Sequence, residues 1–209
     1  MSVGSRIRAA LHDPLAARFE RHHGERMRRR QLAPAHGRVL EIGAGTGANL
    51  PHYPAAVAVL TVTEPDEAML RRARRRRSGV GGPTLLVRAP AQALPFAVAS
   101  FDTVACTAVL CTVPDQDAAL AEVRRVLRPG GQLLFVEHVR SGDPVRARWQ
   151  DRLERPWGVI AGGCHPNRDT AAALARAGFE VEIAERGDLP MLPRLVRPFI
   201  MGRALSPPA

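Results

Sequence analysis

The sequence predicts an α/β protein, in which helices cover both faces of a doubly wound, mostly parallel, Rossmann-like sheet. From Arg38 onward, short β-branched or leucine-rich runs alternate with longer amphipathic stretches. A glycine-rich turn follows the first of these runs directly, at the place where open α/β sheets bind ligands. The 209 residues, 45% hydrophobic and 24% charged, suit one compact domain.

Six runs are short and apolar enough to be strands of a buried sheet. We expect these strands at 38–42, 57–63, 84–88, 101–107, 132–138 and 179–184. Helices are expected between them at 47–52, 67–77, 115–127, 144–155 and 168–177. The helix at 115–127 has the clearest signals: acidic residues begin it, arginines precede its end, and Pro129-Gly130-Gly131 ends it.

Residues 1–36 are polar, arginine-rich and helical in character, with Leu11, Leu15, Phe19 and Met27 at helical spacing. We expect this segment to be a helical extension that forms a lid over the ligand site. Residues 37–205 are then the ligand-binding domain, and residues 206–209 are a frayed tail.

The chain carries a net charge of +10, and all 30 of its basic residues are arginine. We interpret arginine without lysine as the coding bias of a GC-rich bacterial genome. Aromatic residues are only 4%, too few for base-stacking platforms, so no nucleic-acid partner is expected. Peripheral contact of the run 71–77 with an anionic membrane stays open. Three cysteines without CxxC spacing and the lack of a signal peptide predict a cytoplasmic protein.

The strongest functional signal is the run from Val39 to Gly47, where a strand enters a turn with glycine at 43, 45 and 47. Residues without Cβ let the backbone turn tightly and approach a ligand. The spacing GxGxG differs from the GxGxxG of dinucleotide sites. Glu41 would repel a pyrophosphate but attract a cationic sulfonium or ammonium group. Glu64 ends the next strand, where an acid accepts hydrogen bonds from ribose hydroxyls.

In order and spacing, this turn, the acid after the second strand, the segment 91–96 and the turn 127–131 resemble class I S-adenosylmethionine-dependent methyltransferases. The resemblance covers roughly 38–184 and implies S-adenosylmethionine as cofactor. Three positions depart from the family pattern: Ala89 and Pro90 replace the usual Gly-Asp, and Gln92 replaces the usual Glu. The cofactor-binding residues implied are Glu41, Gly43, Ala44, Gly45, Thr46, Gly47, Glu64, Pro65, Ala91, Gln92, Thr107 and Leu110.

The stretches 106–139, 149–157, 162–170 and 196–204 are similar to the alkyl-thiol S-methyltransferase group. This group is related to phospholipid N-methyltransferases and quinone-ring methyltransferases. The resemblance implies methyl transfer to a small, partly apolar acceptor, with a thiol as the first choice. A quinone, a phenol or a phospholipid amine stays an alternative. A non-enzymatic alternative is a basic protein that binds polyanions on the same scaffold.

A thiol attacks as its thiolate, so a histidine near the acceptor would raise the reactive fraction. The candidates are His138, which follows Glu137 at the end of the fifth strand, and His165, in a glycine-rich loop. Direct transfer needs no covalent intermediate, so Cys164 is expected to be a small apolar residue. Trp149 and Trp157 are candidate walls of the acceptor pocket. No metal is expected, because no metal-ligand spacing occurs.

Overall fold

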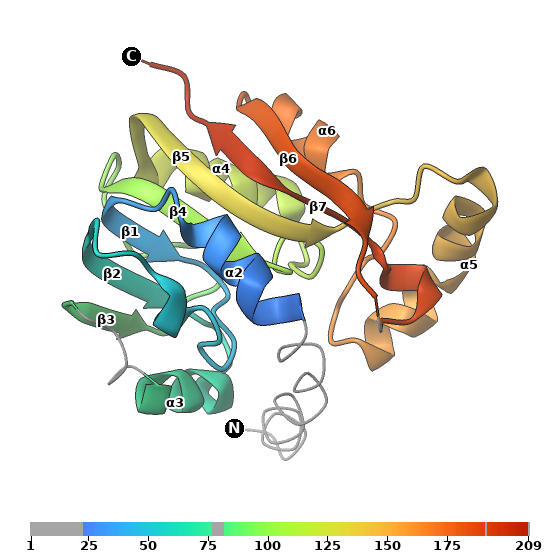
Figure 1. Cartoon of the computed structure of the whole chain (residues 1–209), viewed down its shortest axis with the longest axis horizontal. Helices are drawn as coiled ribbons and strands as arrows, with labels where there is room; N and C mark the ends of the chain where they lie inside the picture. Colours follow the sequence, from blue (N-terminus) through green and yellow to red (C-terminus); the bar gives the residue numbers. More distant parts are fainter. Residues whose placement is uncertain (1–22, 77–81, 191, 209) are drawn as a thin grey trace.

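The computed structural model describes residues 23–76, 82–190 and 192–208 (Figure 1). Most of the expected N-terminal extension, with Leu11, Leu15 and Phe19, lies outside the described residues. Its described end contains helix α2 (Glu25–Leu32), which packs on the sheet through the buried Leu32. Met27 and Arg28 of α2 line a cavity that is described below.

Seven strands form one sheet in the order β3-β2-β1-β4-β5-β7-β6 (Figure 1). All pairs are parallel except those of β7, which runs antiparallel to both β5 and β6. The order reverses at β1, the switch point where ligands bind in doubly wound sheets. The strands are β1 (Gly37–Glu41), β2 (Val57–Thr63), β3 (Thr84–Val87), β4 (Phe101–Thr107), β5 (Leu127–His138), β6 (Glu180–Asp188) and β7 (Pro198–Leu205).

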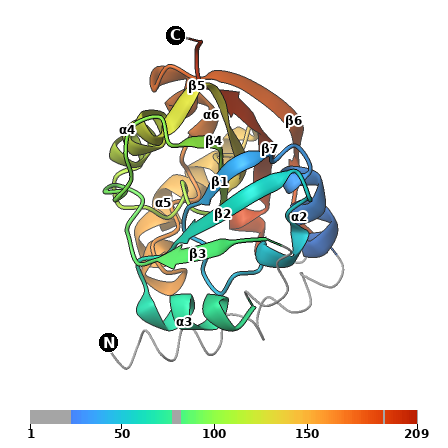
Figure 2. The same ribbon diagram turned by 90° about the vertical axis from the view of Figure 1, so that its left-hand side faces the viewer.

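Apolar side chains on both faces of the sheet explain the continuous apolar runs in the sequence. Leu40 packs into the larger core with residues of α4 and α6, whereas its neighbour Val39 packs with residues of α2 and α3. Figure 2 shows α4 and α2 on opposite sides of the sheet. The helices are α3 (Glu67–Arg76), α4 (Gln116–Val126), α5 (Pro144–Ile160) and α6 (Thr170–Arg176), with 3₁₀ turns η2 (Leu50–His52) and η4 (Arg194–Val196).

The fold class predicted from the sequence is confirmed, but several elements differ from expectation. Strand β7 was not predicted, because Pro198 and Gly202 interrupt its apolar run. The helix expected at 47–52 is only the turn η2, since the positive φ of Gly47 is incompatible with a helix. Residues 127–131 belong to β5 instead of a turn. Helix α5 continues through Pro156 to Ile160.

Gly202 decides how closely β6 and β7 can pair. A Cβ at this position would lie 2.2 Å from the carbonyl oxygen of Glu182, far inside van der Waals contact. We therefore expect Gly202→Ala to lower the free energy of unfolding by about 1–3 kcal/mol, measured by urea denaturation. Gly142→Ala is the matched control, because a Cβ at Gly142 meets nothing within 4 Å. Equal stability of the two variants would contradict this account.

Candidate functional site

The glycine-rich turn after β1 uses its three glycines in two different ways. Gly43, Gly45 and Gly47 all have positive φ, at 61°, 56° and 82°. A Cβ on Gly43 would lie 2.7 Å from Val109, and one on Gly47 would lie 3.0 Å from the Cα of Ala73. A Cβ on Gly45 would meet nothing within 4 Å, so the turn is open to a ligand there.

Glu64 joins the end of β2 to this turn. One of its carboxylate oxygens accepts the backbone N–H of Gly45 at 2.9 Å, and the other accepts the N–H of Asp66 at 2.9 Å. The carbonyl of Thr63 also accepts the N–H of Ala44 at 3.0 Å. The acid expected to bind ribose therefore also fixes the conformation of the glycine-rich turn.

A cavity of about 350 Å³ opens beside the turn at the carboxyl ends of β1, β4 and β5. Six of the expected cofactor residues line this cavity: Glu41, Gly43, Ala44, Gly45, Thr46 and Thr107. The other expected residues, Gly47, Glu64, Pro65, Ala91, Gln92 and Leu110, are not on its wall. The wall also includes residues that are not among the expected cofactor-binding residues: Met27, Arg28, Ala48, Asn49, Ala108, Val136, Leu189 and Leu192.

Glu41 places a buried acid on the cavity wall, with only 2% of the residue exposed. Burial raises its pKa to about 7, although the hydroxyl of Tyr53, which donates to Oε2 at 3.0 Å, acts in the opposite direction. The guanidinium of Arg28 also favours the ionised form. A cation bound in the cavity would stabilise the carboxylate further.

Polar side chains from distant parts of the chain form a network at the cavity. Arg28 donates to the amide oxygen of Asn49 at 2.7 Å, and the amide nitrogen of Asn49 donates to the hydroxyl of Thr107 at 3.0 Å. That hydroxyl donates to Gln31 at 2.8 Å. These hydrogen bonds connect helix α2 to the segment that follows β1 and to the end of β4. The sequence could not reveal this, because nothing in a helix of arginines indicates which residue faces a ligand.

Glu137, which precedes the candidate base His138, holds the loop that follows β4. Its fully buried carboxylate accepts the backbone N–H groups of Val109 and Leu110 through Oε1, at 2.9 and 3.0 Å. Oε2 accepts the N–H of Cys111 at 3.0 Å. Burial raises the pKa of Glu137, while these three hydrogen bonds act to lower it. Leu110, one of the expected cofactor residues, therefore contacts Glu137 through its backbone N–H group.

His138 lies on the cavity wall. Its Nδ1 lies 2.5 Å from the carbonyl oxygen of Val196, an acceptor, so Nδ1 carries the hydrogen. Burial holds the pKa of His138 below the usual 6.5. The ring is therefore neutral at pH 7, and its Nε2 carries the lone pair.

The other candidates from the sequence lie elsewhere. His165 pairs with Glu154 of α5 and is not on the cavity wall. Cys164 is buried in an apolar cluster with Cys111 and Val196. Trp157 packs against that cluster, whereas Trp149 is exposed on the outer side of α5.

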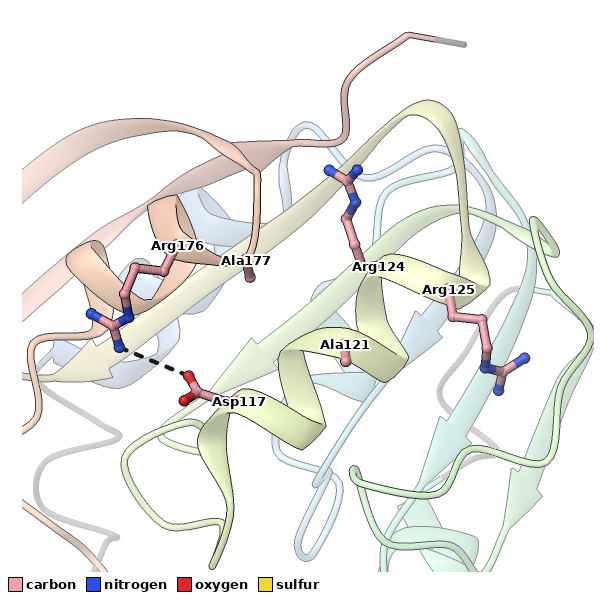
Figure 3. A pocket seen from close by; sticks show the side chains of 6 residues that line it. All are labelled: Asp117, Ala121, Arg124, Arg125, Arg176 and Ala177. Atoms are coloured by element: carbon pink, nitrogen blue, oxygen red, sulfur yellow. Dashed lines mark ion pairs between the residues drawn. The ribbon is translucent and has the colours of Figure 1, made fainter.

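A larger hollow of about 620 Å³ lies between α4 and α6 (Figure 3). Arg176 faces Asp117 across it at 3.8 Å, as the dashed line in Figure 3 shows. Arg124 donates to the carbonyl of Gly178 at 2.6 Å, and Arg125 pairs with Glu122. This hollow contains no residue of the glycine-rich turn, so we place the chemistry in the smaller cavity.

The basic run 71–77 begins on α3, and several of its arginines form ion pairs or hydrogen bonds within the protein. Arg71 and Arg74 pair with Glu67, and Arg76 donates to the hydroxyl of Thr46 at 3.1 Å. Arg77 lies outside the described residues. Among the described helices, none combines the length and apolar character needed to cross a bilayer.

Together, the parallel sheet, the glycine-rich turn and the acid after β2 define a class I methyltransferase. Residues 40–135 match the family described as methyltransferase domain. Human thiol S-methyltransferase TMT1B is 38% identical over 181 residues, which cover 84% of this chain and 74% of that protein. Human thiol S-methyltransferase TMT1A is 36% identical over 172 residues, covering 80% and 70%. The chain belongs to the S-adenosylmethionine-dependent methyltransferases.

A solved structure supports the same fold. The S-adenosylmethionine-dependent methyltransferase of Thermotoga maritima has a TM-score of 0.72 to this chain at 22% identity. The match covers 96% of this chain and 97% of that one. At this level of identity the likeness concerns the fold alone.

The residues on the cavity wall fit S-adenosylmethionine, which carries a sulfonium and an ammonium group. Gly45 leaves the turn open, and Glu41 supplies a buried carboxyl that a cation would stabilise. Asn49 and Thr107 add polar groups on the same wall. Glu41, the turn 43–46 and Thr107 are thus the residues that would hold the cofactor.

Cofactor binding should depend on the ionisation of Glu41. Since its pKa is about 7 in the free protein, the carboxylate fraction grows as the pH rises from 6 to 8. We expect the affinity for S-adenosylmethionine, measured by calorimetry, to rise about tenfold over this interval. Glu41→Gln should bind more weakly and without this dependence.

Tyr53→Phe is the matched variant. It removes the hydrogen bond that lowers the pKa of Glu41. The midpoint of the pH dependence should therefore move to higher pH. A dependence that persists in Glu41→Gln would show that another group controls cofactor binding.

Glu137→Gln should destabilise the fold, because an amide cannot accept all three N–H groups and brings its own donors against them. We expect a loss of at least about 2 kcal/mol in the free energy of unfolding, measured by urea denaturation. Glu180→Gln changes an exposed carboxylate of β6 and should stay within about 0.5 kcal/mol of the unmodified protein. Similar losses in both variants would disprove the assigned role of Glu137.

Proposed function

We propose that this methyltransferase acts on a small, partly apolar thiol, and that His138 is its general base. The observation that carries the proposal is the position of His138 on the cavity wall, with Nδ1 bonded to the carbonyl of Val196. The names of the human relatives, thiol S-methyltransferases, support the same acceptor class.

The state of His138 suits proton removal from a weak acid. Its lowered pKa keeps the ring neutral at pH 7, and the bond to Val196 leaves Nε2 as the proton acceptor. A free thiol has a pKa of about 8.5, so little thiolate exists at neutral pH without a base. A base on the cavity wall allows the thiol to react while it loses its proton.

Apolar residues on the cavity wall support an acceptor with an apolar body. Val136 and Ala108 lie near His138 in the fold, at the ends of β5 and β4, and Met27, Leu189 and Leu192 line the same cavity. These side chains exclude water from the reacting atoms and so favour in-line approach of the thiol.

S-adenosylmethionine, when bound, supplies a methyl group on a positively charged sulfur. The thiol sulfur would take this methyl group, and the electron pair of the broken carbon–sulfur bond would stay on the donor sulfur. The thiol proton passes to Nε2 of His138 and then to solvent. Glu41 would serve to hold the positively charged donor.

Replacing the base should slow the reaction in a pH-dependent way. Asn can still donate to the carbonyl of Val196, so His138→Asn removes the base with little change in the packing. With an alkyl thiol at pH 7, we expect kcat/KM to fall about 10²-fold or more. The deficit should shrink as the pH rises past about 8.5, where the thiol ionises without help.

His165→Asn is the matched control, since His165 pairs with Glu154 and is not on the cavity wall. It should keep most of the activity. Cofactor affinity, measured by calorimetry, should be unchanged in both variants. If His138→Asn loses activity equally at every pH, His138 has only a structural role. Transfer to a phenol, a quinone or an amine, without transfer to any thiol, would contradict the proposed acceptor.

A further inference from the structure

Helix α5 exposes an apolar stripe to solvent. The described residues include seven large exposed apolar side chains, and five of them lie on this one helix: Val145, Trp149, Leu153, Val159 and Ile160. Spacings of about one or two helical turns place four of them in a line along the helix: Val145, Trp149, Leu153 and Ile160. Val159 and Ile160 are 87% and 80% exposed, and Trp149 is 52% exposed. Concentration of such residues on one surface marks an interaction site.

The opposite side of α5 is fixed to the protein mainly by polar contacts. The fully buried amide nitrogen of Gln150 donates to the carbonyls of Val139, Pro166 and Leu195, at 3.2, 2.9 and 2.9 Å. Its amide oxygen accepts the N–H of Ser141 at 2.7 Å. Because both the nitrogen and the oxygen of this amide are hydrogen-bonded to the protein, α5 cannot rotate its apolar stripe inward without breaking these bonds.

Arginines accompany the apolar stripe. Arg148, Arg152 and Arg155 are exposed on α5, and the guanidinium of Arg152 lies 5.6 Å from the centre of the Trp149 ring. Within the described part of the chain, no carboxylate forms an ion pair with any of the three. Helices that lie in the interface of an anionic membrane combine tryptophan and leucine on one face with arginine or lysine on the polar face. The outer face of α5 has this composition.

The inner side of α5 is connected to the cavity through packed apolar side chains. Trp157, on the inner side of α5, packs against the cluster of Cys111, Cys164 and Val196, and Leu192 packs there too. Leu192 in turn lines the cavity. Figure 1 shows α5 at one end of the molecule, away from the edge strand β3, so its outer face can approach a flat surface.

We propose that the outer face of α5 is a docking surface for an anionic lipid bilayer, with the apolar stripe in the interface and the arginines on lipid headgroups. Charge favours a bilayer over a second copy of the chain. A symmetric dimer through this face would bring two sets of arginines together, on subunits that each carry +10. Docking would place the cavity near apolar acceptors dissolved in the membrane.

The test uses the full chain and sedimentation with vesicles of phosphatidylcholine, either alone or with about one-third phosphatidylglycerol, at about 0.15 M salt. We expect binding to the anionic vesicles and little binding to phosphatidylcholine alone. Trp149→Ser with Ile160→Ser should weaken binding at least about tenfold. Arg148→Gln, Arg152→Gln and Arg155→Gln together should do the same.

Two control variants separate this surface from general charge and general apolarity. Leu85→Ser with Val98→Ser removes exposed apolar side chains that are not on α5. Arg71→Gln, Arg74→Gln and Arg75→Gln remove the same charge from α3. Both controls should bind vesicles as the unmodified protein does. All variants change exposed residues, and thermal unfolding checks that each is folded.

Several results would overturn the proposal. They are absence of binding to anionic vesicles, equal loss in the α3 control, and retention of binding by the Trp149 and Ile160 variant. Sedimentation velocity can give a further result against the proposal. A dimer that dissociates in the Trp149 and Ile160 variant, with no vesicle binding by the unmodified protein, would assign the stripe to a second copy of the chain.

Discussion

The carboxylate of Glu137 holds the carboxyl edge of the sheet in the shape that the active site needs. Glu137 is the penultimate residue of β5 and has no exposure to solvent, and its carboxylate accepts three consecutive backbone N–H groups from the loop that follows β4. A charged or polar group at such depth is tolerated only because these donors satisfy it. The loop that Glu137 fixes packs Val109 against Gly43 and presents Ala108 to the cavity. The glycine-rich turn, the loop after β4 and the end of β5 therefore form one rigid wall.

Glu41 shows the opposite use of a buried acid. Its pKa is raised to about 7, so the free energy of unfolding falls as the pH rises from the usual value of 4.5 towards 7. The free protein thus carries a destabilised carboxylate on the wall of its cavity. A cation bound beside Glu41 would stabilise the carboxylate and so remove this destabilisation. Part of the favourable free energy of cofactor binding would come from this effect. Glu137 accepts three backbone N–H groups, whereas Glu41 accepts the hydroxyl of Tyr53 and lies on the cavity wall.

The two sides of the cavity come from different parts of the chain and have different chemistry. We place the cofactor on the side formed by the turn after β1, Glu41 and the polar network of Arg28, Asn49 and Thr107. The proposed acceptor side is formed by His138 and the apolar residues of α2, β5 and the segment before η4. The outer face of α5 lies beyond this second side. An apolar acceptor, a neutral base and an apolar docking surface are consistent with one another.

The sequence by itself determined the fold class, the glycine-rich turn, the two acids and the candidate His138, because each depends on local patterns of a few residues. Parallel strands give apolar runs, and a turn with positive φ requires glycine at particular positions. Only the tertiary structure decided which residues share a cavity. It brought Arg28 and Leu192 to Glu41, separated His165 and Trp149 from the site, and inserted β7 between β5 and β6. These outcomes depend on long-range packing and strand pairing, for which neighbouring residues in the sequence carry no signal.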